Sequence, residues 1–269
     1  MSGFQGAVCL ITGAGSGIGA ALATALSSQG AKVVATDLRL DGVDALAKSG
    51  AAQEAHALDV TDAAAVAACV DAVVAKHGRL DYVFNNAGIS VCGDARDLEL
   101  SHWRSVIEVN LMGVVHGAHA AYRQMARQGS GHIVNIASLA GLVPFPTNAP
   151  YAASKHAVVG LSLSLRTEGE DLGVKVSAVC PGFIQTGIFA ATPFINADAE
   201  KIMKEIPFPP IPASEAAARI LDGVRRNQAV ISFPGYARFL WRLYRWWPGV
   251  LNVLGRKQIR DLRRARKVQ

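Results

Sequence analysis

The residues of this sequence whose types and spacing could carry acid–base chemistry are Tyr151 and Lys155. They are four positions apart, so on a helix both side chains share one face. An ammonium beside a phenol favours the phenolate and lowers a phenol pKa that is ordinarily about 10. The pair could therefore exchange a proton near neutral pH. By itself, such a pair is more often an ordinary helix face with a lysine that reaches solvent, so its meaning depends on its surroundings.

A glycine-rich turn supplies such surroundings. It follows an apolar run, opens a helical pattern and reads Thr12-Gly13-Ala14-Gly15-Ser16-Gly17-Ile18-Gly19. Glycines in this context allow a tight turn and let the backbone approach a pyrophosphate at the helix N-terminus. The spacing, G-x-x-x-G-x-G, is a variant of the usual dinucleotide-binding pattern. We expect a cofactor contact at Gly13, Ser16, Gly17, Ile18 and Gly19. A flexible strand-to-helix turn is the alternative.

The type of dinucleotide is indicated by Asp37, which closes the second predicted strand. A carboxylate there hydrogen-bonds the adenosine ribose hydroxyls and repels a 2′-phosphate. Ala14 and Ser16 offer no basic partner for such a phosphate, although Arg39 lies close by in the sequence. We therefore expect NAD in preference to NADP. A strand-end acid with no ligand is the alternative interpretation of Asp37.

The elements that must position these residues alternate regularly along the chain. Short apolar runs predict strands at 7–12, 32–36, 54–60, 81–86, 131–137, 175–180 and 229–233. Their continuous apolar character is typical of parallel strands buried on both faces. Helical patterns lie between them at 18–29, 62–77, 98–127, 150–171 and 214–227. This alternation predicts an α/β fold with a doubly wound, mostly parallel sheet, the Rossmann fold, in one domain over 1–234.

Composition narrows the class of protein. The chain has 269 residues, of which 51% are hydrophobic, enough for a sizeable core. The first residues lack the pattern of a signal peptide, and no apolar run is long enough to span a membrane. The four cysteines are scattered without metal-ligand spacing, and His116 and His119 share a helical face with no third ligand. A reduced, cytoplasmic protein without a metal site is expected.

With these motifs placed, the chain resembles the short-chain dehydrogenase/reductase family over about residues 5–234. The glycine turn matches the family's TGxxxGxG, and Asn85-Asn86-Ala87-Gly88 matches the NNAG that ends its fourth strand. Ser138, at the end of the fifth predicted strand, precedes Tyr151-x-x-x-Lys155 by the family's spacing. Asn110 falls in a long helix where the family has its catalytic asparagine. Several separate motifs in order carry this assignment.

The resemblance implies a reaction and a set of site residues. Tyr151 would exchange a proton with the substrate oxygen while the nicotinamide exchanges a hydride with the carbon. Lys155 would hold the nicotinamide ribose, Ser138 would orient the reacting oxygen, and Asn110 would hold a water that links Lys155 to solvent. Further cofactor contacts would come from Asp59, Val60, Asn86, Ala87, Gly88, Pro181, Gly182, Ile184 and Thr186. His156, next to Lys155, is turned about 100° away on a helix and is expected to pack or contact solvent.

The substrate is indicated only by an apolar segment. Residues 183–212 contain several phenylalanines and isoleucines, and Leu139, Leu142, Val143 and Phe145 lie between Ser138 and Tyr151. No arginine suited to a carboxylate or phosphate stands out. We expect a lipophilic secondary alcohol or ketone, such as a steroid-, retinoid- or lipid-like molecule. The alternative is that many of these side chains belong to the core.

The C-terminal extension, 235–269, differs from the rest in charge. Residues 225–269 hold 12 Lys/Arg and one acid, whereas 1–224 has a net charge of −5. On a helical wheel Arg238, Arg242 and Arg245 form one cluster, with Phe239, Leu240, Leu243, Trp246 and Trp247 on the other side. This pattern is typical of a helix that lies on an anionic membrane, so peripheral membrane contact through 236–269 is one expectation. Packing on the body, a dimer contact or a lid over the substrate are the alternatives, and nucleic-acid binding is not expected.

Two other functions are kept open. One is an NADPH-dependent ketone reductase; the other is a non-catalytic dinucleotide-binding regulator, which would be expected to lose part of the catalytic set. The family resemblance also suggests a homodimer or homotetramer built on the helices near 98–127 and 150–171.

Overall fold

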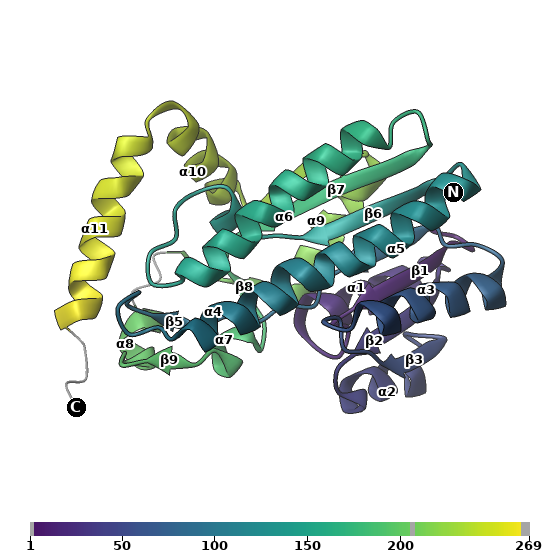
Figure 1. Cartoon of the computed structure of the whole chain (residues 1–269), viewed down its shortest axis with the longest axis horizontal. Coiled ribbons are helices and arrows are strands. Elements are labelled where there is room, and N and C mark those ends of the chain that lie inside the picture. Colours follow the sequence, from purple (N-terminus) through teal and green to yellow (C-terminus); the bar gives the residue numbers. More distant parts are fainter. Residues whose placement is uncertain (1–2, 205–207, 265–269) are drawn as a thin grey trace.

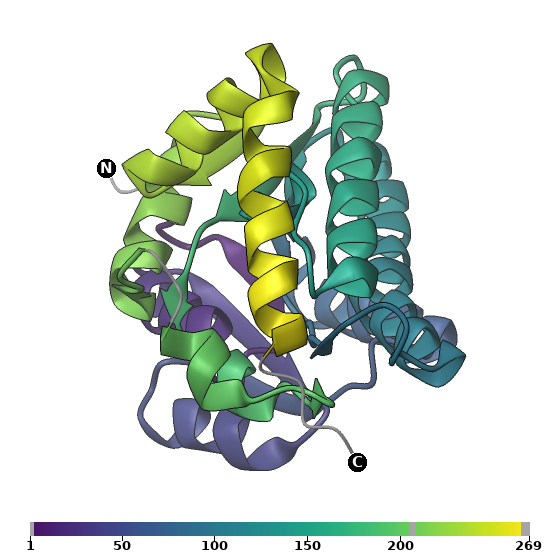
Figure 2. The same cartoon turned by 90° about the vertical axis from the view of Figure 1, so that its left-hand side faces the viewer.

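A parallel sheet of seven strands forms the centre of the structure, a computed structural model that describes residues 3–204 and 208–264. Its strand order is β11-β7-β6-β4-β1-β2-β3, and helices cover both faces (Figures 1 and 2). The strands are β1 (Val8–Thr12), β2 (Lys32–Asp37), β3 (Glu54–Ala57), β4 (Tyr82–Asn85), β6 (Gly131–Ile136), β7 (Val174–Pro181) and β11 (Val230–Phe233). The predicted doubly wound α/β fold is confirmed.

The helices connect these strands in the expected alternation. They are α1 (Gly17–Ser27), α2 (Leu40–Lys48), α3 (Ala63–His77), α4 (Leu100–Ile107), α5 (Gly113–Gln128), α6 (Ala149–Glu168), α7 (Ile188–Ala191), α8 (Ala199–Lys204), α9 (Ala213–Arg225), α10 (Gly235–Trp246) and α11 (Pro248–Arg264). Local chemistry sets some ends. The Asp62 carboxylate accepts hydrogen bonds from the backbone N–H groups of Ala64 and Ala65 and caps α3. Gly78, with a left-handed backbone, ends α3.

Side chains alternate between the two faces of the sheet. In β1, Cys9 and Ile11 join a core cluster with α1 and α9, whereas Val8 and Leu10 join a second cluster with α3 and α5. Because successive residues of a strand point to opposite faces, burial of all five β1 residues requires a helix layer on each side. This explains the continuous apolar runs of the central strands.

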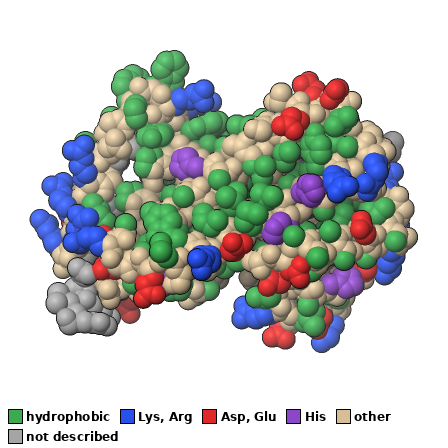
Figure 3. Space-filling model, viewed as in Figure 1, with side chains coloured by type: hydrophobic (Ala, Val, Ile, Leu, Met, Phe, Trp, Pro, Cys, Tyr) green, Lys and Arg blue, Asp and Glu red, His purple; other side chains and the backbone are tan. Residues whose placement is uncertain are grey.

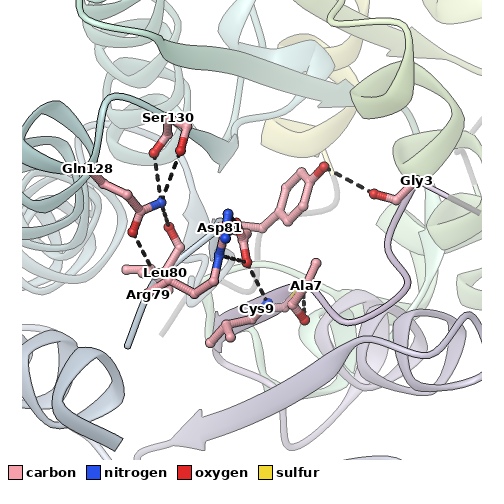
Figure 4. Close-up of polar contacts among 10 residues, drawn as sticks. Gly3, Ala7, Cys9, Arg79, Leu80, Asp81, Gln128 and Ser130 are labelled. Carbon is pink, nitrogen blue, oxygen red and sulfur yellow. Dashed lines mark hydrogen bonds and ion pairs between the residues drawn. The ribbon is translucent and has the colours of Figure 1, made fainter. Parts of the chain in front are cut away.

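The polar network at the amino-terminal ends of the strands lies away from the glycine turn. The Asp81 carboxylate accepts a 2.9 Å hydrogen bond from the backbone N–H of Val8 and pairs with Arg79 (Figure 4). The Gln128 side chain bonds both the N–H and the carbonyl of Leu80, at 3.1 Å each. These contacts fix the ends of β1, β4 and α5 relative to one another. The carboxyl ends of the strands, where open α/β sheets bind ligands, carry the candidate site.

Several local predictions were wrong or incomplete. The single helix expected over 98–127 is three segments, because a π-helix (Glu108–Met112) separates α4 from α5. The strand expected over 54–60 ends at Ala57 and is half exposed, since β3 is at the edge of the sheet. Helix α2 was not predicted. Two short parallel pairs, β5 (Cys92–Gly93) with β9 (Phe194–Ile195) and β8 (Ile184–Gln185) with β10 (Ile211–Pro212), were also missed.

The C-terminal extension folds as two helices that meet at Trp247 and Pro248 (Figure 1). Helix α10 packs against a third core cluster formed by α6, β7 and the segment after Ser138. Its inward side chains are Tyr236, Ala237, Leu240, Trp241 and Tyr244. The expected apolar arc is divided: Leu240 faces the body, whereas Phe239, Trp246 and Trp247 are exposed.

Candidate active site

The turn between β1 and α1 is shaped by its glycines. Gly13 and Gly17 have positive φ angles of 64° and 56°, which residues with a Cβ rarely adopt. A Cβ at Gly13 would lie 2.7 Å from the Ala87 Cα, and one at Gly19 would overlap the Gly13 carbonyl oxygen. Ser16 precedes α1 without using its side chain as a cap. The result is a backbone-lined cradle at a helix N-terminus, which suits a diphosphate.

Thr12 and Asn86 join this turn to the end of β4. The Thr12 hydroxyl accepts hydrogen bonds from the backbone N–H groups of Asn86 and Ala87, at 3.0 and 3.2 Å. The Asn86 amide donates in return to the carbonyl oxygens of Thr12 and Gly13, at 3.0 and 2.8 Å. The two motifs that the sequence analysis treated separately therefore form one structural unit.

Asp37 closes the cradle on the side of β2. Its carboxylate accepts a 2.9 Å hydrogen bond from the backbone N–H of Gly15 and a 3.3 Å bond from that of Arg39. The neighbouring Leu38 side chain is exposed. A carboxylate at this position, directly beside the glycine turn, suits the hydroxyls of an adenosine ribose.

The other predicted cofactor residues are spread along the carboxyl edge of the sheet. Thr186 lies against Gly17, where an added Cβ would come 3.0 Å from the Thr186 Cγ2. Asp59 is exposed and bonded to Thr61, and the carbonyl of buried Val60 accepts a 2.9 Å hydrogen bond from His116. Pro181 ends β7, Ile184 is buried in β8, and Ile18 packs against the core cluster of α1. The Gly182 N–H donates to Phe233.

Lys155 and Tyr151 lie on one face of α6, as their spacing predicts. The Lys155 ammonium is 5.5 Å from the centre of the Tyr151 ring. It donates a 2.8 Å hydrogen bond to the Ile136 carbonyl at the end of β6, and the residue is only 3% exposed. A Cβ placed at Gly88 would be 3.6 Å from the Lys155 ammonium and 3.3 Å from the Asn110 side-chain oxygen. Strand β6 and the loop after β4 thus position the lysine.

The pKa values of Tyr151 and Lys155 differ from those expected from the sequence. Burial raises the pKa of Tyr151 above its usual value, and a hydrogen bond with the Ser138 side chain offsets part of that rise. Burial also lowers the pKa of Lys155 to about 8. The expected lowering of the Tyr151 pKa is therefore not found in this structure, because desolvation dominates. The group that lowers the Tyr151 pKa is Ser138.

Asn110 lies fully buried within the π-helix. Its side-chain oxygen accepts a 2.8 Å hydrogen bond from the N–H of Ile89, and its amide donates a 2.9 Å bond to the Ile89 carbonyl. The amide also reaches the Ser154 hydroxyl on α6, at 3.3 Å. Single π-helical turns are frequent at functional sites. Here the turn directs Asn110 between the loop after β4 and the helix that carries Tyr151.

The apolar side chains that were expected to line the substrate fall into two groups, one in the core and one beside the end of β7. Leu139, Leu142 and Val143 are buried in the cluster beneath α10, which agrees with the alternative that these side chains belong to the core. Phe183 is 6.2 Å from both Phe145 and Phe189, measured between ring centres. These three rings form an apolar wall beside the end of β7. The segment 183–212, expected to line the substrate, also contains Met203 and Ile206, whose side chains lie outside those that the structure describes.

Helix α11 runs along the end of the molecule that carries β5, β9 and the start of α6 (Figures 1 and 2). A Cβ at Gly255 would lie 3.0 Å from the Pro146 side chain, in the segment that precedes α6. Near the end of α11, Arg263 donates a 2.7 Å hydrogen bond to the carboxylate of Asp94. Asp94 is 4% exposed and also pairs with Arg96. Helix α11 therefore bridges the segment before α6 and the β5–β9 pair.

Sequence analysis missed Asp94, Arg263 and Cys180. The Cys180 thiol is buried, and desolvation raises its pKa to about 12 while the Ser138 backbone and Lys155 lower it. It lies beneath the candidate catalytic residues, and its position just before Pro181 and Gly182 could have indicated this. Asp94 and Arg263 are 169 residues apart in sequence and carried no signal.

Comparison with known proteins identifies the family. Residues 7–193 match the family profile described as short chain dehydrogenase. The chain belongs to the short-chain dehydrogenase family. It is an oxidoreductase by this membership, and its Rossmann fold is that of the family.

Relatives of this short-chain dehydrogenase include two alcohol dehydrogenases. It is 42% identical to D-threitol dehydrogenase of Mycolicibacterium smegmatis over 68% of this chain and 72% of that protein. It is 37% identical to cyclohexanol dehydrogenase of an Acinetobacter species over 70% of this chain and 76% of that protein. A crystal structure of a Burkholderia phymatum short-chain dehydrogenase in complex with NAD superposes with a TM-score of 0.81, at 31% identity, covering 91% of this chain and 95% of that one.

The residues present fit a nicotinamide dinucleotide. The glycine cradle leaves no room for a Cβ at Gly13 or Gly19, and Asp37 stands at its edge. Within residues 3–204 and 208–264, no helix is long and apolar enough to cross a membrane.

Proposed function

We propose that this short-chain dehydrogenase transfers a hydride between NAD(H) and a lipophilic secondary alcohol or ketone, with Tyr151 as general acid and base. The observation that carries the proposal is the meeting of Tyr151, Lys155 and Ser138 at the carboxyl edge of the sheet, beside the glycine cradle. Such a meeting supports a proton donor and acceptor that would lie beside a bound dinucleotide.

The roles follow from the contacts. Bound NAD would supply the acceptor for the hydride that leaves the carbinol carbon as the alcohol becomes a ketone. Tyr151 takes the hydroxyl proton in that direction and returns it in the other. Ser138 orients the substrate oxygen and stabilises the Tyr151 phenolate by hydrogen bonding. One of the three N–H donors of the Lys155 ammonium bonds the Ile136 carbonyl, and the other two would bond the nicotinamide ribose.

Asn110 is proposed to hold the elements that carry these side chains in place. Its side chain is bonded to Ile89 and Ser154, so it fixes the loop after β4 against α6. The expected water between Asn110 and Lys155 stays part of this proposal.

NAD is proposed over NADP because of Asp37. Its carboxylate is held toward the cradle by Gly15, where it would repel a 2′-phosphate. An NADPH-dependent reductase is the competing activity, and Arg39 beside Asp37 is the feature that would favour it. A non-catalytic regulator is disfavoured, because such a protein is expected to lose part of the catalytic set.

A lipophilic substrate is proposed from the apolar wall of Phe145, Phe183 and Phe189. The nearby arginines that the structure describes, Arg96 and Arg263, are both paired with Asp94. Cyclohexanol, the substrate named for one relative, is apolar apart from its hydroxyl. A small polyol is the second candidate, favoured by the relative named for D-threitol.

Oxidation of a panel of alcohols with NAD tests this proposal. We expect kcat/KM for cyclohexanol and 2-decanol to exceed that for D-threitol by about tenfold or more, since each buried methylene contributes about 0.8 kcal/mol. A preference for D-threitol would reject the lipophilic substrate but keep the dehydrogenase. Tighter binding of NADPH than of NADH would reject the cofactor assignment.

A homodimer or homotetramer stays a prediction. Leu100 on α4 and Leu163 on α6 are exposed. Hydrophobic side chains cover much of the α5–α6 face (Figure 3). This face is our proposed contact between copies, and light scattering on the purified protein would test it.

A further inference from the structure

Exposed aromatic and aliphatic side chains gather where α10 meets α11. Trp246 is 75% exposed, Trp247 and Phe239 are each 64% exposed, and Val250 and Val253 are exposed as well. We call these five residues, with the arginines Arg238, Arg242, Arg245, Arg256 and Arg260 that flank them, the tail surface. Large apolar side chains clustered in solvent are uncommon and mark an interaction site.

Packing on the body does not account for these side chains. The inward face of α10 is already filled by Tyr236, Leu240, Trp241 and Tyr244, which contact the cluster of α6 and β7. Phe239 and Trp246 lie on the outward side of the same helix, beside exposed Arg242 and Arg245. The body therefore uses one face of α10, and a second apolar set remains uncovered.

Helix α11 continues the same surface. At 100° per residue, Val250, Val253, Arg256 and Arg260 fall within about 120° of one another. All four side chains are exposed. Gly255 and Ile259 face the opposite way, and a Cβ at Gly255 would contact Pro146 of the body. Apart from Phe239, in the first half of α10, the apolar residues lie near the α10–α11 corner, and the basic residues extend along both helices.

The positive charge of the C-terminal extension indicates which class of partner the tail surface would bind. Residues 235–269 contain ten Lys/Arg and one acid, Asp261. Basic side chains also line the edge of the molecule formed by α11 (Figure 3). A second copy docked through the same surface would bring arginines against arginines, which is unfavourable. Tryptophan, phenylalanine and valine surrounded by arginine instead match the boundary between anionic head groups and acyl chains.

We propose that the tail surface docks on an anionic phospholipid membrane, with Trp246, Trp247 and Phe239 in the head-group boundary and the arginines on lipid phosphates. Such docking needs no membrane-spanning helix. Because α11 passes Pro146 and ends at Asp94, it brings the substrate side of the molecule toward the lipid. The proposal stands apart from the reaction, since binding to vesicles is measured without turnover.

Co-sedimentation of the full chain with vesicles is the test. We expect binding to vesicles of equal parts phosphatidylglycerol and phosphatidylcholine, little binding to pure phosphatidylcholine, and weakening as salt is raised. Replacing Arg238, Arg242 and Arg245 together by Gln should weaken binding on the order of 100-fold. The double change Trp246→Ser, Trp247→Ser should weaken it by about tenfold or more.

Matched variants show whether a loss of vesicle binding comes from the tail surface, from the net charge of the protein or from misfolding. The triple change Lys32→Gln, Lys48→Gln, Lys175→Gln removes the same charge from exposed sites elsewhere and should bind like the wild type. Leu172→Ser, at another exposed apolar position, should do the same. Circular dichroism and thermal midpoints verify folding. The proposal would be overturned by equal binding to both vesicle types, or by a loss of vesicle binding in the lysine control equal to that in the arginine variant. Self-association of the protein that disappears in the tryptophan variant, or binding to duplex DNA as tight as binding to vesicles, would also overturn it.

Discussion

The Lys155 ammonium lies 5.5 Å from the centre of the Tyr151 ring and donates a 2.8 Å hydrogen bond to the Ile136 carbonyl. The strand end at Ile136 therefore holds the lysine next to the tyrosine that is proposed to move the proton. Burial is the largest cause that makes the Tyr151 phenolate less favourable and that lowers the pKa of Lys155 to about 8. Hydrogen bonding by Ser138 is the contribution that acts in the opposite direction on Tyr151.

Ser138→Ala should therefore shift the pH dependence of alcohol oxidation. In the proposed mechanism oxidation requires a deprotonated Tyr151, and loss of the Ser138 hydroxyl removes the hydrogen bond that lowers the Tyr151 pKa. We expect the rising limb of kcat/KM against pH to move to higher pH and kcat to fall about 10²–10³-fold. Ser138→Thr, which keeps a hydroxyl, should recover much of the rate. An unchanged pH profile in Ser138→Ala would show that Ser138 does not set this ionisation.

Asp37→Ser should change the cofactor preference. The variant loses the carboxylate that Gly15 holds at the cradle, which is proposed to bind the ribose hydroxyls. A hydrogen bond to a charged group contributes about 1.5–3 kcal/mol, so the Kd for NAD should rise about 10–100-fold, and that for NADP should fall. Fluorescence titration of both reduced cofactors measures this. Asp41→Asn, an exposed acid at the start of α2, is the control that should change neither.

His132 should make the stability of the fold depend on pH. Ser177 donates its hydroxyl proton to the Gln228 carbonyl, so the His132 Nε2 must donate to Ser177. Burial lowers the pKa of this neutral imidazole from 6.5 to about 3. Between these values the unfolded chain binds more protons than the folded one, so stability falls as pH drops from about 6.5 toward 3.

Thermal unfolding of His132→Asn across that range tests the prediction. The variant should be less stable at pH 7, by about 1–3 kcal/mol, and its stability should fall less as the pH is lowered. His156→Gln changes an exposed histidine and should keep the wild-type slope. A slope in His132→Asn equal to that of the wild type would assign the acid sensitivity to other groups.

Arg263→Gln should affect large substrates more than small ones. Arg263 joins α11 to Asp94, so its loss should loosen the helix that crosses the substrate side. We expect KM to rise severalfold for 2-decanol and to change little for cyclohexanol, with kcat nearly constant. Arg256→Gln removes an exposed α11 charge without a bond to Asp94 and serves as the control. Equal KM changes for both alcohols would argue against a substrate role for α11.

Asp94→Asn should remove stability that depends on the carboxylate charge. Arg96 and Arg263 hold the pKa of this carboxyl well below its usual range, against the opposing effect of burial. A depressed pKa contributes stability above the unfolded value of about 3.9 and loses it as the pH falls below that value. The thermal midpoint of Asp94→Asn should therefore lie below the wild type at pH 7, and the difference should begin to shrink only below about pH 3.9. A constant difference between the two would indicate a steric cause.

The sequence could predict those parts of the site that depend on the spacing of neighbouring residues along the chain. Gly13, Gly17 and Gly19 lie where a strand-to-helix turn requires them, and the four-residue spacing of Tyr151 and Lys155 fixes a shared helix face. The ionisation of Tyr151 could not be predicted, because it depends on how deeply the fold buries it. The Arg263–Asp94 bond depends on the path of α11 over the body. Likewise, Leu139 and Leu142 became core because α10 covers them.

Tyr151→Phe gives the most direct test of the central claim, that Tyr151 is the acid and base of a nicotinamide-dependent reaction. The variant keeps the ring beside Lys155 and removes only the hydroxyl. Turnover of the best alcohol and the Kd for NADH should be measured on the same preparation. The account predicts a loss of kcat of about 10³-fold or more with a Kd for NADH within about twofold of the wild type. Turnover within tenfold of the wild type would contradict it.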